Sequence, residues 1–432
     1  MAGSAGDSES RWRRTALGSR ATLYQVGAEK FKTCALRVYL HAPLALETVT
    51  ATALVPHLLG RGCRGYPDLT AIHRRLEHLY GAGVGAGATK RGETQSLFLG
   101  LDVVQGRYLP EDVLPAAVDL LGRMCREPAL DALGSFPPET VRQEKEHMDH
   151  RIRGILNDKA RYAALRCVQA MCGDEPYALS ALGRLEDLPQ LSAGEVTERW
   201  RALLASSPVD IFAVGGGPEL AGLLQTALGP LVEGAAEHPA TPAGPVPAST
   251  RRVTEFDAVQ QAKLCLGYRT AVRRTDPGFA AMLLYSGILG GFPHSKLFRH
   301  VREEASLAYY VFTQWDAVKG VLLIQSGIEA DRLEQALEII GRQVADMAQG
   351  RIDADEMEFT KRGLAHQLQA AEDEPGSLLD SALGQALAAD LRPVRERVAE
   401  IEALTVADVA AVAHGVALDT IYCLRPEEAA SA

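Results

Sequence analysis

Arg302 and Tyr309 are the residues whose types and spacing best suit the binding of a peptide, and they lie seven positions apart in the stretch from Gly291 to Ile328. A guanidinium group and a phenolic hydroxyl both donate hydrogen bonds, so together they could bind a backbone carbonyl or a carboxylate. The spacing by itself more often has a structural meaning, because short motifs have low specificity. In that case Arg302 would be one arm of an exposed ion pair and Tyr309 a half-buried strand residue.

A helix and a β-hairpin must position this pair. Ser295 can cap a helix that ends near Ala305, because apolar residues recur on one face of this stretch. The pattern then changes to strand character over residues 308–314 and, after a turn, over Val321–Ile328. The arginine would therefore lie at the end of a helix and the tyrosine at the start of a strand.

The rest of the chain predicts two similar halves. Its 432 residues suit two domains of roughly 200 residues each. In both halves a strand is followed by two helices, a hairpin, a run of helices and a last strand, so the repeat is of domain size. Each half is expected to be a mostly antiparallel sheet packed with helices, which is the α+β class.

Composition places the domain boundaries. Residues 233–249 are rich in Pro, Ala and Gly and predict a linker without regular structure. Residues 21–232 would form the first domain and residues 250–432 the second. The polar residues 1–20 predict a disordered tail.

Charge and composition also indicate which kinds of partner the chain lacks and in which cellular compartment it works. The formal net charge of −10 argues against nucleic acid as a partner. No apolar run approaches the roughly 20 residues of a membrane span, and the first twenty residues hold no hydrophobic signal segment. The seven cysteines form no CxxC pair, which favours reduced thiols. We therefore expect a cytoplasmic protein with neither a membrane nor a nucleic-acid partner.

The segment HSKLFRHVREEASLAYYV, residues 294–311, resembles a signature of the pitrilysin/insulinase-type metallopeptidases, the inverzincins. In that family an Arg and a Tyr in a segment of the form SxLFxxVRExxxLAY bind the substrate backbone, and Arg302 and Tyr309 match those two positions. The resemblance extends more weakly over nearly the whole chain and implies a duplicated fold like that of the mitochondrial processing peptidase. It is closest to the YmfF-like bacterial branch, which usually lacks the zinc motif and is encoded with a zinc-bearing relative.

The zinc motif of that family is incomplete in this chain. Inverzincins bind zinc through the two His of HxxEH and use the Glu between them as general base. Here His57 fits the first ligand, but Gly60 replaces the general base and Arg61 the second ligand. One imidazole cannot hold a catalytic zinc, which needs three protein ligands, and a guanidinium group repels the cation. Glu144 best matches the family's distal zinc ligand, and without the other ligands we interpret it as part of a charged, solvated helix face.

Two other groups of residues have metal-ligand chemistry but the wrong spacing. His73 and Glu77 share a helix face, whereas His78 points about 100° away from it. His147 and His150 are three positions apart on a helix and could hold at most an adventitious metal. The resemblance therefore implies that this chain contains no catalytic residue and no metal ligand set.

The sequence favours a non-catalytic, peptide-binding subunit of a heterodimeric zinc metallopeptidase. Arg302 and Tyr309 would hold the peptide substrate, while a zinc-bearing homologous subunit supplies the zinc, the base and the water. The zinc cofactor would thus belong to the partner, and this chain would be inactive alone. The sequence leaves open whether the chain pairs with a second copy of itself or with a different homologue.

Two alternatives remain open on the sequence. The chain could be a scaffold or interaction protein of the same fold with no role in proteolysis, and Arg302 and Tyr309 would then be structural. It could also be a self-sufficient metallopeptidase with unusual ligands such as His147 and His150. The sequence names neither the substrate nor the pathway.

Overall fold

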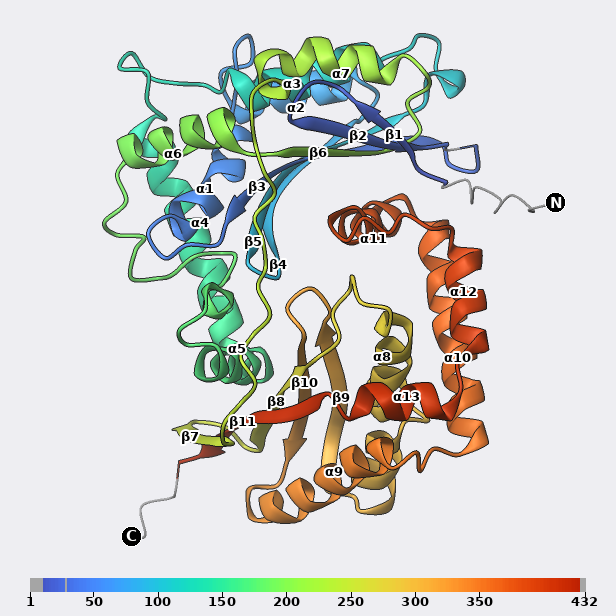
Figure 1. The fold of residues 1–432 in the computed structure, drawn as a ribbon. Helices are drawn as coiled ribbons and strands as arrows, with labels where there is room; N and C mark the ends of the chain where they lie inside the picture. Colours follow the sequence, from blue (N-terminus) through green and yellow to red (C-terminus); the bar gives the residue numbers. More distant parts are fainter. Residues whose placement is uncertain (1–10, 28, 428–432) are drawn as a thin grey trace, which may run out of the picture. The chain divides into compact units, whose positions relative to one another are not determined.

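The computed structural model describes residues 11–27 and 29–427, and the chain divides into two compact units (Figure 1). Among the described residues, unit 1 holds those up to 152 together with 179–240 and 371–392. Unit 2 holds 153–178, 241–370 and the residues from 393 onward. Each unit is therefore built from three stretches of the chain, and not from one of the two continuous halves predicted from the sequence. The predicted α+β class is confirmed, with a mixed sheet in each unit.

Unit 1 contains a six-stranded sheet with the strand order β1-β2-β6-β3-β5-β4. Only the pair of β2 and β6 is parallel, and the other neighbours are antiparallel. The strands are β1 (Arg13–Ala16), β2 (Ala21–Val26), β3 (Thr33–Pro43), β4 (Gly83–Arg91), β5 (Thr94–Val104) and β6 (Val209–Val214).

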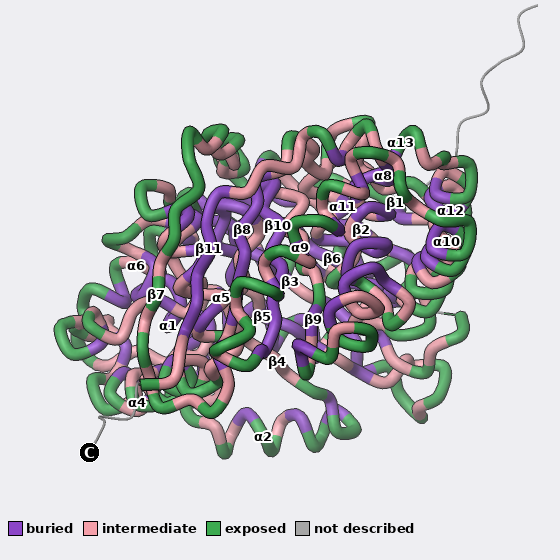
Figure 2. Tube along the Cα trace, turned by 90° about the horizontal axis from the view of Figure 1, so that it is seen from below, coloured by how far each residue is buried: buried purple, intermediate pink, exposed green. Residues whose placement is uncertain are grey.

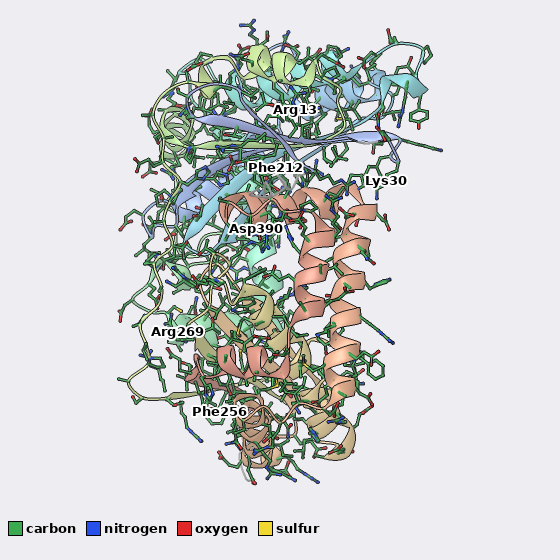
Figure 3. The ribbon with its side chains drawn as sticks, turned by 45° about the vertical axis from the view of Figure 1, so that its right-hand side comes forward. Arg13, Lys30, Phe212, Phe256, Arg269 and Asp390 are labelled. Carbon is green, nitrogen blue, oxygen red and sulfur yellow. The ribbon has the colours of Figure 1, made fainter. Side chains whose placement is uncertain are left out.

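Helices pack on both faces of this sheet. α11 (Pro375–Leu387) covers one face, where its Leu379 and Leu383 join a buried cluster with Tyr39 and Phe212, and Figure 3 shows Phe212 between the sheet and that helix. The other helices of unit 1 are α1 (Val49–Leu59), α2 (Leu69–His78), α3 (Leu114–Arg126), α6 (Ala193–Ser206) and α7 (Leu220–Leu228). α4 (Pro138–Asn157) belongs to unit 1 up to residue 152.

Residues 11–20 do not form the disordered tail expected from the sequence, and residues 1–10 lie outside the described part of the chain. β1 pairs with β2, and Trp12 is buried with its ring centroid 6.3 Å from that of Phe212. The sequence hides this strand because β1 is an edge strand whose side chains are mostly exposed, so it shows no apolar alternation.

Unit 2 contains a five-stranded sheet with the order β7-β11-β8-β10-β9, in which only β7 and β11 are parallel. The strands are β7 (Arg251–Asp257), β8 (Ala262–Thr270), β9 (Ala308–Asp316), β10 (Val321–Ile328) and β11 (Val416–Pro426). The helices are α5 (Lys159–Met171), α8 (Phe279–Ser286), α9 (Leu333–Ala348), α10 (Ala354–Ala370), α12 (Val394–Ala403) and α13 (Val406–Ala413).

The alternation of side chains along β8 builds a core on each face of the second sheet. Leu264 and Leu266 join the buried cluster formed with α8, α9 and α13. Cys265 points to the opposite face and packs with Cys167 of α5. Figure 2 shows the buried residues running through the central strands β8 and β10.

A buried ion network ties the chain after α5 to this sheet. The Arg269 guanidinium group, placed in Figure 3, lies 2.6 Å from Glu175 and 3.1 Å from Asp419. Lys319 Nζ lies 2.6 Å from the same Glu175. Two cations therefore compensate two carboxylates out of water, which is the condition for tolerating buried charge.

The remaining elements are short. Residues 233–250 form no helix or strand. The 3-10 segments are η1 (Gly106–Tyr108), η2 (Pro176–Ala178), η3 (Gly229–Val232), η6 (Ala330–Arg332) and η7 (Ala371–Asp373), and the π-helical ones are η4 (Gly287–Gly291) and η5 (Phe298–Glu304). Within the described residues, none of the helices combines the length and apolar character that a membrane crossing requires.

Candidate functional site

The structure brings Arg302 and Tyr309 together on the surface of unit 2. Arg302 lies in the last turn of η5 and Tyr309 is the second residue of β9, and the guanidinium carbon lies 6.0 Å from the centroid of the Tyr309 ring. The same carbon lies 4.6 Å above the Phe298 ring, so the guanidinium group is held between two aromatic rings. Tyr309 is 74% exposed, and Arg302 has no carboxylate partner among the described residues. The ion-pair arrangement is therefore not what the structure contains, and binding of substrate by the pair stays a prediction.

Local backbone geometry aims the tyrosine at the arginine. Ser306, between η5 and β9, has a φ of 52°, and the Leu307 amide donates to the Val301 carbonyl at 3.0 Å. The register of β9 against β10 then skips Tyr309, which makes it the extra residue of a β-bulge. Bulges redirect a side chain out of the regular alternation, and a non-glycine residue with positive φ is uncommon outside functional sites and turns.

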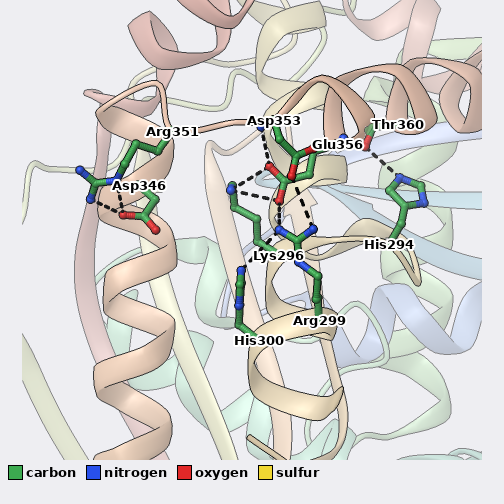
Figure 4. A network of polar contacts seen from close by, with 9 residues as sticks. All are labelled: His294, Lys296, Arg299, His300, Asp346, Arg351, Asp353, Glu356 and Thr360. Atoms are coloured by element: carbon green, nitrogen blue, oxygen red, sulfur yellow. Dashed lines mark hydrogen bonds and ion pairs between the residues drawn. The ribbon is translucent and has the colours of Figure 1, made fainter. Parts of the chain in front are cut away.

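Buried ion pairs fix the segment that carries Arg302 onto α10 (Figure 4). Glu356 of α10 is 3% exposed and lies 2.8 Å from Lys296 Nζ and 2.7 Å from Arg299 Nη2. Asp353 caps the start of α10 by accepting from the Glu356 amide at 2.7 Å. The carboxylate of Glu356 thus anchors both cations, and η5 cannot shift without leaving buried charge unpaired.

The place of the family's zinc site in unit 1 is occupied by arginine. Arg61, just after α1, forms an ion pair with Glu144 of α4, and its Nη2 lies 3.3 Å from His147 Nδ1. Glu144 is only 5% exposed, so its assignment to a solvated helix face was wrong. The cause is Arg61, whose positive charge compensates the buried carboxylate in place of a metal.

His57 has a second arginine as its neighbour. Arg151 Nη1 lies 2.6 Å from His57 Nε2, so the imidazole accepts a hydrogen bond from a cation. Burial and, after it, the positive charge of Arg151 together lower the pKa of His57 to about 4. These residues do not fit a zinc ion, because one candidate ligand faces Arg151 and another is paired with Arg61.

The other candidate ligands remain apart. His73, Glu77 and His78 are exposed on α2, and His147 and His150 are exposed on α4. None of these five residues belongs to a group of three possible ligands within the described part of the chain. The alternative of a self-sufficient peptidase therefore lacks a ligand set around His147 and His150.

Comparison with known proteins identifies the family. Residues 190–364 match the family model described as the peptidase M16 inactive domain. The chain is 33% identical to the probable inactive metalloprotease YmfF of Bacillus subtilis over 95% of its own length and 97% of that protein. The chain belongs to the M16 peptidase family. The resemblance to this family and to its YmfF-like branch is thereby confirmed.

Other M16 proteins and solved structures agree. A conserved protein from Enterococcus faecalis V583 superposes with a TM-score of 0.90 at 30% identity, covering 97% of this chain and 100% of that one. An M16 inactive domain from Pseudomonas fluorescens, 20% identical, shares the fold with a TM-score of 0.80 over 97% and 99% of the two chains. The uncharacterized zinc protease YmxG of Bacillus subtilis is 31% identical over 26% of this chain and 28% of its own length.

Proposed function

We propose that this chain is the non-catalytic, peptide-binding subunit of a heterodimeric zinc metallopeptidase. Its homology to the probable inactive metalloprotease YmfF supports the coarser statement that it is an M16 homologue of the inactive kind. The observation that carries the proposal is the exposed pair of Arg302 and Tyr309, held together by a bulge and a network of ion pairs.

The chemistry at the zinc place supports a subunit that does not cut peptides. Arg61 brings a fixed positive charge to that place and pairs with Glu144, so this carboxylate is not free to bind a metal. Gly60 has no side chain that could take a proton from water, so the general base is missing as well. A Lewis acid and a base would both have to come from another chain.

The surroundings of Arg302 and Tyr309 support the binding of an extended peptide. β9 is the edge strand of its sheet and pairs only with β10, so its outer edge offers backbone donors and acceptors. A peptide can add a strand to such an edge, and side-chain donors beside it can bind the peptide carbonyls. Tyr309 lies at the start of that edge strand, and Arg302 lies beside it in η5.

The partner we propose is a zinc-bearing M16 homologue in the cytoplasm. Members of this family often pair. In such a pair the partner's zinc would activate water, and this chain would orient the substrate, which is an effective division because positioning alone supplies a large part of a rate enhancement.

The test is to purify the chain, add a homologue with an intact HxxEH motif and follow the cleavage of a fluorogenic peptide library. We expect cleavage only in the mixture, with kcat/KM at least 10-fold lower for Arg302→Ala and Tyr309→Phe. Arg362→Ala, an exposed arginine paired with Glu358, and Tyr80→Phe, an exposed tyrosine of unit 1, are the matched controls and should keep full activity.

Two outcomes would contradict the proposal. Hydrolysis by the isolated chain that a chelator abolishes would show an independent peptidase. A stable complex whose peptidase activity is unchanged by Arg302→Ala and by Tyr309→Phe would instead support the scaffold alternative.

A further inference from the structure

A polar cluster in unit 1, with two of its three members buried, lies outside the site described above. His41 of β3 and Asp210 of β6 lie on neighbouring strands, and His238 approaches them from the irregular stretch after η3. His41 Nε2 is 3.3 Å and His238 Nε2 is 3.6 Å from the same oxygen, Asp210 Oδ2. It is the only trio of possible metal ligands within the described residues whose ligand atoms all lie within 4.8 Å of one another.

The His41 imidazole is prepared as a ligand. Its side chain is fully buried, and Nδ1 lies 2.8 Å from Ser96 Oγ on the adjacent strand β5. Nε2 is buried and makes no hydrogen bond among the described residues. In a metal-bound imidazole, one ring nitrogen usually donates its hydrogen to a neighbouring group and the other nitrogen binds the metal through its lone pair. In His41, Nδ1 could take the first role and Nε2 the second.

We propose that His41, Asp210 and His238 bind a divalent first-row transition-metal ion, with zinc as the natural occupant. Two imidazole nitrogens and one carboxylate oxygen form a ligand set that zinc takes with a water in the fourth position. Tetrahedral bonds of about 2.0–2.2 Å separate neighbouring ligand atoms by about 3.4 Å, close to the two distances to Asp210. The ion would also neutralise the buried Asp210 carboxylate.

His238 determines how the metal ion reaches the site and what the bound ion does to the chain around it. Its side chain is 46% exposed, so the ion can enter from that side, whereas His41 and Asp210 lie within the sheet. Because residues 233–250 form no helix or strand, a bound ion would fasten the start of this stretch to β3 and β6. None of these three residues belongs to the position of the M16 zinc site, which Arg61 occupies, so the proposed site is a different one.

The experiment uses the full chain, stripped of metal by a chelator and titrated with Zn²⁺ in competition with a chromophoric chelator. We expect one equivalent to bind and Zn²⁺ to raise the Tm. Titration with Co²⁺ should give the strong visible absorption of a four-coordinate site. His238→Ala, which changes an exposed residue and leaves the sheet intact, should weaken Zn²⁺ binding at least 10-fold, and Asp210→Asn should do the same.

His147→Ala, which removes an exposed histidine at the M16 zinc place, is the matched control and should bind Zn²⁺ like the wild type. The proposal fails if the wild type takes up no stoichiometric Zn²⁺, if uptake survives His238→Ala, or if uptake disappears with His147→Ala. If Asp210→Asn does not fold, the His238→Ala result alone decides. None of these readouts involves peptidase activity, so the result is independent of the proposed function.

Discussion

Arg61 has taken over the electrostatic role that a metal would have beside Glu144. A buried carboxylate needs a compensating positive charge, and a guanidinium group supplies it with directed hydrogen bonds. The ion pair joins the residues just after α1 to the first half of α4, so the charge that replaces the metal also connects two helices.

Arg61→Ala should therefore destabilise unit 1 rather than open a metal site. It leaves Glu144 buried without its partner, and we expect the free energy of unfolding to fall by about 3 kcal/mol. Urea denaturation measures this change. The double variant Arg61→Ala/Glu144→Gln should recover part of the loss, because it removes the uncompensated charge. Equal stabilities of the single and double variants would contradict this account.

His57 makes stability depend on pH in a defined window. Its pKa in the folded chain is about 4, below the 6.5 of a free imidazole, so between these values the unfolded chain binds the extra proton. The contribution of the neutral imidazole is complete above pH 6.5 and is lost as the pH falls toward 4. We expect the wild type to lose on the order of 1–2 kcal/mol more than His57→Gln between pH 7 and pH 4.5.

Urea denaturation at a series of pH values measures that difference. Glutamine can still accept from Arg151 but does not titrate, so it isolates the proton. His414→Gln, which changes an exposed histidine, is the control and should follow the wild-type curve. Parallel curves for the wild type and His57→Gln would show that the imidazole does not carry the effect.

At the scale of elements, the hairpin β9–β10 was predictable because both strands alternate strongly and a turn separates them. The predicted hairpin of 308–314 and Val321–Ile328 agrees closely with the strands observed. The helix before it was also predicted, but its π-helical form at η5 was not, because no sequence period distinguishes one wide turn from an α-helix.

The sequence could not predict which carboxylate pairs with the cations of the segment that carries Arg302. Lys296 and Arg299 share a face at helical spacing, which indicates only that their side chains lie together. The carboxylate they bind, Glu356, is 60 and 57 positions away. The cluster around His41 was missed for the same reason, although a histidine and an aspartate inside apolar strands are a signal, since buried polar residues are rare without partners.

Glu356→Gln tests whether this network holds the Arg302 segment in place. It removes the negative charge between two cations, one of them buried, and we expect the free energy of unfolding to fall by about 3–4 kcal/mol. Asp346→Asn is the matched control, because Asp346 pairs with the exposed Arg351 and should cost less than about 1 kcal/mol. Urea denaturation compares the two variants, and similar losses would show that the buried network has no special weight.

On the scale of the whole molecule, each unit contains one helix from the part of the sequence that mainly forms the other unit. α5 precedes the 233–249 stretch in the sequence and packs on the sheet of unit 2, whereas α11 comes late in the sequence and packs on the sheet of unit 1. A hydrophobic pattern shows that a helix buries one face but not which sheet receives it. The duplication of the fold was therefore predictable, and the ownership of these two helices was not.

Cutting the chain between residues 240 and 241 tests this exchange. A fragment of residues 1–240 lacks α11, so Tyr39 and Phe212 would lose the leucines that cover them. We expect this fragment to bind the dye ANS strongly and to melt without a cooperative transition, while the intact chain does neither. A synthetic peptide of residues 371–392 should suppress the ANS signal, whereas a scrambled peptide should not. A fragment that melts cooperatively without the peptide would mean that the continuous half folds by itself and that α11 adds only an outer layer.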